Sequence, residues 1–174
     1  MRPFLLLLLV PLLAACGDST GPISAEEVGG VYQICSLAFT PGGALQPVDI
    51  RVAAMAASPP PLLTLSNQIR EFELEYRLPG DQLAQRPRGS YETGAGSVTL
   101  VFTEPARASA LLLPARLRLD VQQAPQALTV STQQPYNVTR TDYARLAGIS
   151  EVNLSPEITG TVSGRFVITG SPCS

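Results

Sequence analysis

A strict period of two in the placement of apolar residues constrains the fold of this chain more than any other feature. In the segment 71–78 (EFELEYRL) every even position is apolar and every odd position is charged. This alternation predicts a β-strand with one face on a core and the other in water, because successive side chains of a strand point to opposite faces. The same alternation returns in the segments 115–121 and 158–168.

Six other segments show the alternation more weakly, and turn residues separate most of the candidates. About nine short strands with turns between them predict an all-β, antiparallel barrel or sandwich. The segment 94–96 (GAG) predicts a turn, and 59–61 (PPP) predicts an extended connection. The weaker strand candidates are 31–39, 48–54, 62–66, 97–102, 127–132 and 136–141.

Two short helices fit between the strands. The segment 24–27 (SAEE) has the form of a capping box, in which a Ser and a Glu side chain satisfy the first turn of a helix. Asp142 could cap a second helix over 143–147, which Gly148 would end.

The first fifteen residues form a separate unit. Arg2 is their only charged side chain, and residues 4–15 form an apolar run interrupted only by Pro11. This run is too short to cross a bilayer core, which needs about twenty apolar residues. Because it ends in small residues before a polar segment, it predicts a cleavable export signal.

The end of this run, Leu13-Ala14-Ala15-Cys16, resembles the lipobox of bacterial lipoproteins. The resemblance implies cleavage between Ala15 and Cys16, a diacylglyceryl group on the Cys16 sulfur and a fatty acyl chain, such as palmitate, on the new amino terminus. Two or three acyl chains give a stable anchor, so the lipid would hold the protein on a membrane of the cell envelope. Gly17 follows the cysteine, and by analogy with enterobacterial sorting this favours the outer membrane, on its periplasmic or outer face, over the inner membrane.

The sequence thus divides into a signal peptide (1–15), a lipidated cysteine with a flexible tether (16–25) and a single β domain (26–174). Removal of the signal leaves 159 of the 174 residues, which suits one domain with a real core.

The two remaining cysteines, Cys35 and Cys173, predict a disulfide bond. Exported proteins reside where disulfides persist, and an even number of cysteines is expected there. The bond would close a loop of about 138 residues and contribute up to roughly 5 kcal/mol in the chain-entropy model. The alternative is two separate buried thiols.

Missing residue types exclude most catalytic designs. The chain has no histidine and no lysine, so it lacks an imidazole base, a Schiff-base amine and a histidine metal site. We therefore expect no enzyme activity, no cofactor and no metal. After the loss of Arg2, 11 arginines stand against 14 acidic residues, a net charge of −3 that disfavours nucleic-acid binding.

Glu71, Glu73 and Glu75 are the strongest carboxylate cluster, with neighbours about 6.6 Å apart at strand rise. This spacing suits the carboxyl pair of a glycosidase. Three acids on the outward face of a strand are, however, more typical of a solvated surface. The expected cross-strand partners are Arg116 and Arg118.

Consecutive hairpins, a short helix before the last long strand and a cysteine bridge to the C-terminus resemble the arrangement of lipocalin-like β-barrels. The resemblance is architectural, because Gly30-Val31-Tyr32 stands where lipocalins carry Gly-x-Trp. It implies a single antiparallel β-barrel, with an immunoglobulin-like β-sandwich as the alternative.

The inward residues of such a barrel either fill its interior or line a cavity for one small apolar ligand. We predict a membrane-anchored, non-enzymatic structural or interaction module whose partner is an envelope protein. The alternative is a carrier that binds a small apolar ligand. The candidate cavity residues are Tyr32, Phe72, Leu74, Tyr76, Phe102, Leu117 and Phe166.

Overall fold

The computed structural model describes residues 22–55, 61–78, 81–123, 126–131 and 135–173. The predicted signal peptide, Cys16, the tether up to residue 21 and part of the predicted proline connection lie outside these ranges. The first described residues already contact the domain. Pro22 forms a β-bridge with Ala95, and the Ile23 N–H donates a hydrogen bond to the Gly94 carbonyl at 3.1 Å.

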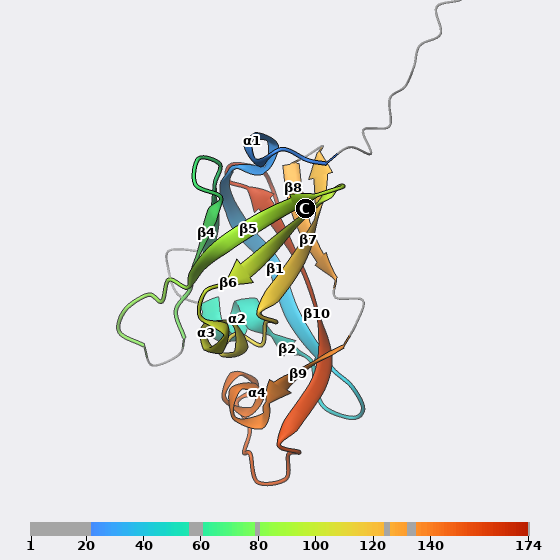
Figure 1. The fold of residues 1–174 in the computed structure, drawn as a ribbon. Helices are drawn as coiled ribbons and strands as arrows, with labels where there is room; N and C mark the ends of the chain where they lie inside the picture. Colours follow the sequence, from blue (N-terminus) through green and yellow to red (C-terminus); the bar gives the residue numbers. More distant parts are fainter. Residues whose placement is uncertain (1–21, 56–60, 79–80, 124–125, 132–134, 174) are drawn as a thin grey trace, which may run out of the picture.

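Eight antiparallel strands form a closed β-barrel (Figure 1). Each strand pairs with the next barrel strand along the chain, and the last strand pairs with the first. The predicted antiparallel barrel is therefore confirmed over the sandwich. The barrel strands are β1 (Gly30–Pro41), β3 (Leu62–Ser66), β4 (Glu71–Glu75), β5 (Arg88–Gly94), β6 (Ser97–Phe102), β7 (Arg116–Gln123), β8 (Gln126–Ser131) and β10 (Glu157–Ile168).

The ladder between β1 and β10 continues beyond the barrel. Both strands have 12 residues, and their pairing runs from Tyr32–Ile168 to Pro41–Gly160. At its far end β2 (Val48–Asp49) pairs with β1, and β9 (Tyr136–Thr139) pairs with β10. These four strands form a small sheet that extends one side of the barrel.

Short helices lie at the two ends of the barrel (Figure 1). α1 (Ala25–Val28) lies at one end, which we call the α1 end. At the opposite end, which we call the helical end, lie α2 (Ile50–Met55), α3 (Pro105–Ser109) and α4 (Arg140–Ala147). Among the described residues, no helix is long and apolar enough to cross a membrane.

The core forms because each barrel strand turns alternate side chains inward. In β4, for example, Phe72 and Leu74 are buried between outward glutamates. The buried side chains form one continuous hydrophobic cluster, which occupies the barrel and extends to the helices at both ends. Burial of apolar surface, at about 25 cal/mol per Å², is the main contribution that stabilises such a fold.

A β-bulge at Cys35 changes which side of β1 faces the core. The register against β10 shifts between Ile34 and Ser36. Ile34 is buried before the bulge and Leu37 after it, so the inward positions change from even to odd. A bulge has this effect because it adds one residue to one strand of the pair.

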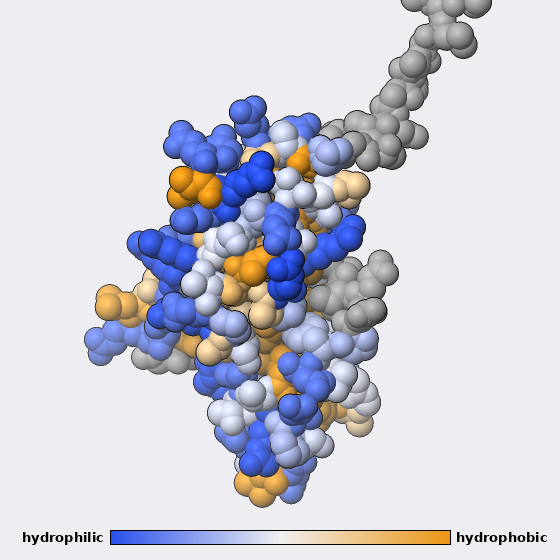
Figure 2. All heavy atoms as spheres, in the orientation of Figure 1, coloured by the Kyte–Doolittle hydropathy of each residue, from blue (hydrophilic) through white to orange (hydrophobic). Residues whose placement is uncertain are grey.

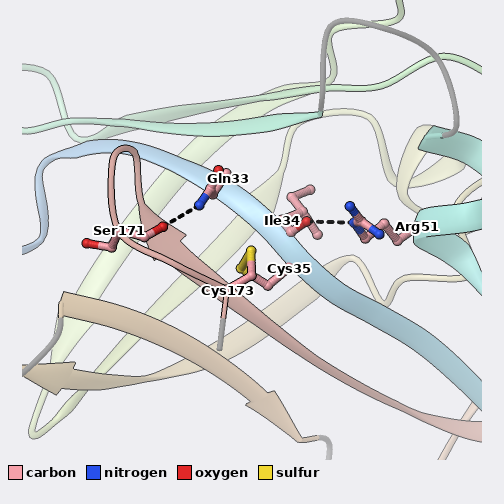
Figure 3. The surroundings of a disulfide bond; sticks show 6 residues. All are labelled: Gln33, Ile34, Cys35, Arg51, Ser171 and Cys173. Carbon is pink, nitrogen blue, oxygen red and sulfur yellow. Dashed lines mark hydrogen bonds between the residues drawn. A yellow bond between two sulfur atoms is a disulfide. The ribbon is translucent and has the colours of Figure 1, made fainter.

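The predicted disulfide bond joins Cys35, at this bulge, to Cys173 (Figure 3). After β10 the chain turns back, and the Gln33 side-chain amide donates a hydrogen bond to the Ser171 carbonyl at 2.6 Å. From α2, the Arg51 Nε–H donates a hydrogen bond to the carbonyl of Ile34, the residue before the bulge, at 2.9 Å. The C-terminal segment is thus fixed beside the strand that closes the barrel.

The strand predicted over 48–54 is wrong beyond its first two residues. Only β2 is extended, and α2 begins at Ile50. The Asp49 carboxylate accepts a hydrogen bond from the Val52 N–H at 3.0 Å. This contact caps the first turn of the helix, and it outweighs the alternating pattern of the segment.

The strand predicted over 136–141 is shortened in the same way, because α4 begins at Arg140. Its N-cap is Thr139, whose hydroxyl accepts a hydrogen bond from the Asp142 N–H at 3.1 Å. The predicted cap at Asp142 is therefore wrong. Gly148 ends the helix as predicted, with a left-handed φ of 66°.

Candidate functional site

The structure brings all seven candidate cavity residues together inside the barrel. They come from five segments of the chain, and their exposed fractions lie between 0% and 4%. Phe72 and Phe102 meet edge to face, with ring centroids 4.9 Å apart. All seven belong to the continuous hydrophobic cluster, so their neighbours are other side chains of the same core.

α1 covers the barrel at the α1 end, and a polar contact holds it there. The Tyr32 hydroxyl donates a hydrogen bond to the Val28 carbonyl at 2.8 Å. The side-chain amide of Gln126, from β8, donates to the Glu27 carbonyl at 2.7 Å and to the Tyr32 hydroxyl at 2.9 Å. Burial raises the pKa of Tyr32 to about 12, although the bond from Gln126 acts in the opposite direction.

The predicted capping box is present at the beginning of α1. The Ser24 N–H donates to the Glu27 carboxylate at 2.7 Å, and the Ser24 hydroxyl accepts from the Glu27 N–H at 3.2 Å. The backbone hydrogen bond from Ser24 lowers the pKa of Glu27. A helix of one turn is stable here because its cap is complete and Val28 is fully buried.

Aromatic side chains close the helical end. The Phe39 ring makes edge-on contacts with Tyr136, at 5.7 Å between centroids, and with Tyr143, at 6.3 Å. The Tyr143 hydroxyl donates to the Gln46 carbonyl at 2.7 Å, and the Tyr136 hydroxyl donates to the Leu112 carbonyl. Burial raises the pKa of both tyrosines.

Polar contacts between α3 and α4 complete the helical end. The Ser109 hydroxyl donates to the Asp142 carboxylate at 2.8 Å, and Arg145 donates to the Ala110 carbonyl at 2.8 Å. Burial raises the pKa of the nearby Tyr76, against the opposing effect of Arg107 and Arg145. Side chains of α3 and α4 thus hold this end together.

The three glutamates of β4 lie on the outer surface. Arg88 contacts Glu73 at 2.6 Å, and Arg86 contacts Glu75 at 3.2 Å. Both arginines belong to β5 or the segment before it, which the alternation did not reveal. A paired outer face of this kind lacks the enclosed, desolvated carboxyl group of a glycosidase acid.

The cross-strand partners predicted for these glutamates, Arg116 and Arg118, are wrong. Arg116 contacts Glu92 at 2.8 Å, and Arg118 contacts Asp120 at 3.3 Å. We call the outer face of β4, β5, β6 and β7, with these ion pairs, the charged wall. Figure 2 shows hydrophilic side chains spread over this side of the molecule.

Three surface hollows are lined by described residues. One lies at the helical end between the β1–β2 connection and the segment before β10, where Leu45 and Leu154 contribute to it. A second lies beside α1 between Ile23 and Gln126, and a third lies on the outer side of β3 and β4. Within the described ranges, no three or more His, Cys, Asp or Glu residues gather where they could hold a metal ion.

Gln126 is the residue at the α1 end that sequence reasoning missed. It shares the parity of Leu128 and Val130, which are buried in β8, so the period of two could have placed it inward. The contact between Phe39 and the tyrosines had no such signal, because it depends on how α4 folds against the sheet.

Together these features define a closed, eight-stranded antiparallel β-barrel with short helices at both ends and a C-terminus fixed by a disulfide bond. In comparisons with known proteins, no family model, no curated protein and no solved structure matches this chain. The functional argument therefore depends on the residues themselves.

Proposed function

We propose that this protein is an exported bacterial lipoprotein, anchored by lipid on Cys16, whose barrel is a non-enzymatic structural or interaction module of the cell envelope. The lipobox sequence at residues 13–16 supports the anchor. The Cys35–Cys173 disulfide bond supports export, because such bonds persist in oxidising compartments. We place the anchor in the outer membrane, on the basis of Gly17.

The main support for the proposed role is that side chains of the protein itself occupy the barrel interior. The candidate cavity residues are at most 4% exposed and pack in the same cluster as the residues of both ends. The Tyr32 hydroxyl, which could have faced a ligand, instead holds α1. An interior occupied by the protein's own side chains favours a module that acts through its outer surface.

The placement of Pro22 and Ile23, the first described residues, suggests which surface is displayed. Pro22 and Ile23 contact the β5–β6 hairpin, so the anchored segment joins the barrel at the α1 end. With lipid on Cys16, the α1 end would face the membrane. The helical end would then be presented away from it, to a partner protein of the envelope.

Metabolic labelling with radioactive palmitate tests the anchor. We expect label in the wild-type protein and none in Cys16→Ser, with the wild type in the membrane fraction at the mass of a chain that begins at Cys16. Cys35→Ser is the matched control, because it removes a cysteine that carries no lipid in this proposal. Equal label in wild type and Cys16→Ser would overturn the anchor.

The role of the barrel is tested by crosslinking in intact cells followed by purification of the anchored protein. A defined envelope protein, crosslinked through residues of the helical end, would support the interaction module. Native mass spectrometry of the same preparation provides the opposing test. A stoichiometric small molecule retained after removal of detergent would overturn the module.

A carrier of a small apolar ligand is the second candidate, favoured by one observation. α1 covers an end of the barrel with a single turn, which the side chains of Tyr32 and Gln126 hold by one hydrogen bond each, and these two side chains are bonded to each other. A lid of this size could open to admit a ligand. The double variant Tyr32→Phe, Gln126→Ala would then speed the exchange of a bound apolar dye, which a packed interior would not bind.

A further inference from the structure

The outer face of β8, β10, β1 and β9 differs from the charged wall, and we call it the hydroxyl wall. Its outward side chains are mostly small and uncharged. Glu157 lies at its far end, where it accepts a hydrogen bond from Asn137. The hydroxyl and amide side chains of this wall are Gln33, Ser36, Thr40, Thr129, Asn137, Thr139, Thr159, Thr161 and Ser163.

Arg165 is the one arginine on the hydroxyl wall. Phe166, next to it in β10, is buried in the core, so Arg165 projects from the outer face. It is partly buried, and its Nε atom is buried without a hydrogen-bond partner among the described residues. Buried donors are nearly always paired in folded proteins, so an unpaired guanidinium nitrogen requires an explanation.

The other described arginines differ from Arg165 in this respect. Nine of them contact a carboxylate or a carbonyl group, and Arg70, which has no such contact in the described ranges, is exposed to water. Only Arg165 combines partial burial with the lack of a described partner. Within the described ranges, the fold therefore holds a positive charge at this place whose Nε atom has no hydrogen-bond partner.

The register places two hydroxyl residues directly beside Arg165. Ser36 of β1 is its partner on one side, and Thr129 of β8 is its partner on the other. The bulge at Cys35 sets this alignment, because the register shift brings Ser36 opposite Arg165. Neighbouring strands are about 4.8 Å apart, so one small group over Arg165 is within reach of both hydroxyl side chains.

No acidic side chain competes for Arg165 within this row of described residues. The row continues from Thr129 to Asp120 of β7, two strands away from Arg165. Asp120 already pairs with Arg118 at 3.3 Å. The Thr129 hydroxyl donates to the Asp120 carbonyl at 3.3 Å, a long bond that it can exchange for a better acceptor.

We propose that Arg165, flanked by Ser36 and Thr129, forms a phosphate-binding site on the outer surface of the barrel. The guanidinium fork suits bidentate binding of a phosphate group through Nε and one terminal nitrogen. Rotation of the side chain outward would give Nε the acceptor that it lacks. The two hydroxyl groups supply donors from either side, which fits a tetrahedral oxyanion. This site requires neither the lipid anchor nor a ligand inside the barrel.

NMR of arginine side chains in the whole protein, held in a non-ionic detergent, tests the site. The Nε–H signal of Arg165 is identified by its absence from Arg165→Gln. Titration with inorganic phosphate is expected to shift this signal with a Kd on the order of 1 mM, as one cation and two hydroxyl donors suggest. A parallel titration with glycerophosphoglycerol, a soluble phosphodiester headgroup, distinguishes the source of the phosphate. A shift with both ligands indicates a lipid headgroup, and a shift with inorganic phosphate alone indicates free phosphate.

Two variants make the result decisive. Arg118→Gln, which removes a paired arginine of the charged wall, should leave the shift unchanged. Arg165→Lys keeps the positive charge but lacks the guanidinium fork. In this variant, phosphate binding is followed by the backbone amide signals of Ser36 and Thr129, and its Kd should be roughly tenfold higher. No shift of the Arg165 signal up to about 20 mM of either ligand, well above the expected Kd, would overturn the site. Equal shifts of the Arg118 and Arg165 signals would overturn it as well, because they would indicate charge screening only.

Discussion

The charged wall and the hydroxyl wall are built on the same antiparallel strands but differ in what their side chains contact. On the charged wall, arginines and carboxylates pair across strands at the surface, as Arg88 and Glu73 do at 2.6 Å. On the hydroxyl wall, the strands are held by close backbone approach, by the β1–β10 ladder and by the Cys35–Cys173 bond. The arginines of the charged wall pair with carboxylates of the same wall, whereas Arg165 of the hydroxyl wall has no such partner among the described residues.

This difference separates stability from surface chemistry. Exposed ion pairs contribute at most about 1 kcal/mol each, because water screens them and long side chains lose entropy on pairing. A disulfide bond and tightly packed backbone contribute several times more. We therefore expect perturbations of the hydroxyl wall to destabilise the barrel far more than equivalent perturbations of the charged wall.

Removal of the disulfide bond is the largest expected effect. The double variant Cys35→Ser, Cys173→Ser should lose about 3–5 kcal/mol of unfolding free energy, because the bond closes a loop of 138 residues in the unfolded chain. Denaturant unfolding of wild type and variant measures the difference. A dithiol reductant should lower the stability of the wild type to that of the variant and leave the variant unchanged. A double variant as stable as the wild type would contradict the expected contribution of the Cys35–Cys173 bond to stability.

Alkaline pH gives the next largest effect, and it acts through tyrosines. Burial raises the pKa of Tyr32 to about 12 from its usual value of 10, so the folded state keeps a proton that the unfolded state loses. This contribution is complete below pH 10 and is lost as the pH rises from 10 to 12, at a cost of at most about 2–3 kcal/mol. The pKa of Tyr136, on the inner side of β9, is raised further, again by burial.

Absorbance of tyrosinate and circular dichroism, followed together from pH 9 to 12.5, measure this effect (the range spans the raised pKa). We expect unfolding and tyrosine ionisation to coincide. Tyr32→Phe should remain folded to higher pH than the wild type, provided both are compared with their own stability at pH 8. Ionisation of all tyrosines without unfolding would show that the stability of the barrel does not depend on their burial.

The two walls also differ in how far they could be predicted from sequence. The strands β3 and β6 have the predicted bounds, although their alternation is weak, because turn residues such as Pro61 and Gly96 precede them. β5 was missed because its inward positions include Gly89 and Thr93 rather than large apolar residues. Gly89 is required there, since a Cβ atom would lie 1.9 Å from the Val101 carbonyl oxygen. The wrong partners for the glutamates of β4 follow from this one missing strand.

The hydroxyl wall was harder to predict for a different reason. The pairing of Cys35 with Cys173 follows from the number of cysteines. The bulge appears in the sequence only as a change of the apolar positions of β1 from even to odd, and this change does not reveal that Ser36 lies opposite Arg165. Arg165 occupies a polar position of an alternating strand and therefore resembles any solvated arginine. Its lack of a described partner becomes visible only when both neighbouring strands are in place.

Glycine substitution on the inner side of the strands that carry the hydroxyl wall is expected to have an intermediate effect. A Cβ atom at Gly160 would lie 2.4 Å from the Phe39 ring and 2.6 Å from the Thr40 carbonyl oxygen. Gly160→Ala should therefore destabilise the protein by about 1–3 kcal/mol, because packed backbone must move apart. Gly42→Ala is the matched control, since its Cβ would meet only the Thr159 carbonyl oxygen, at 3.5 Å. Equal thermal unfolding of the two variants would contradict close packing of this wall.

Removal of an ion pair from the charged wall is expected to have the smallest effect. The side chains of Arg88 and Glu73 are 67% and 29% exposed, so their coupling in a double-mutant cycle of Arg88→Gln and Glu73→Gln should be below about 1 kcal/mol and should decrease with added salt. Because Arg86 also approaches Glu73, at 3.8 Å, it can take over part of the contact when Arg88 is removed. A coupling above about 2 kcal/mol that persists in salt would show that the ion pairs of the charged wall also stabilise the fold substantially. The hydroxyl wall and the charged wall would then no longer differ in how much they stabilise the barrel.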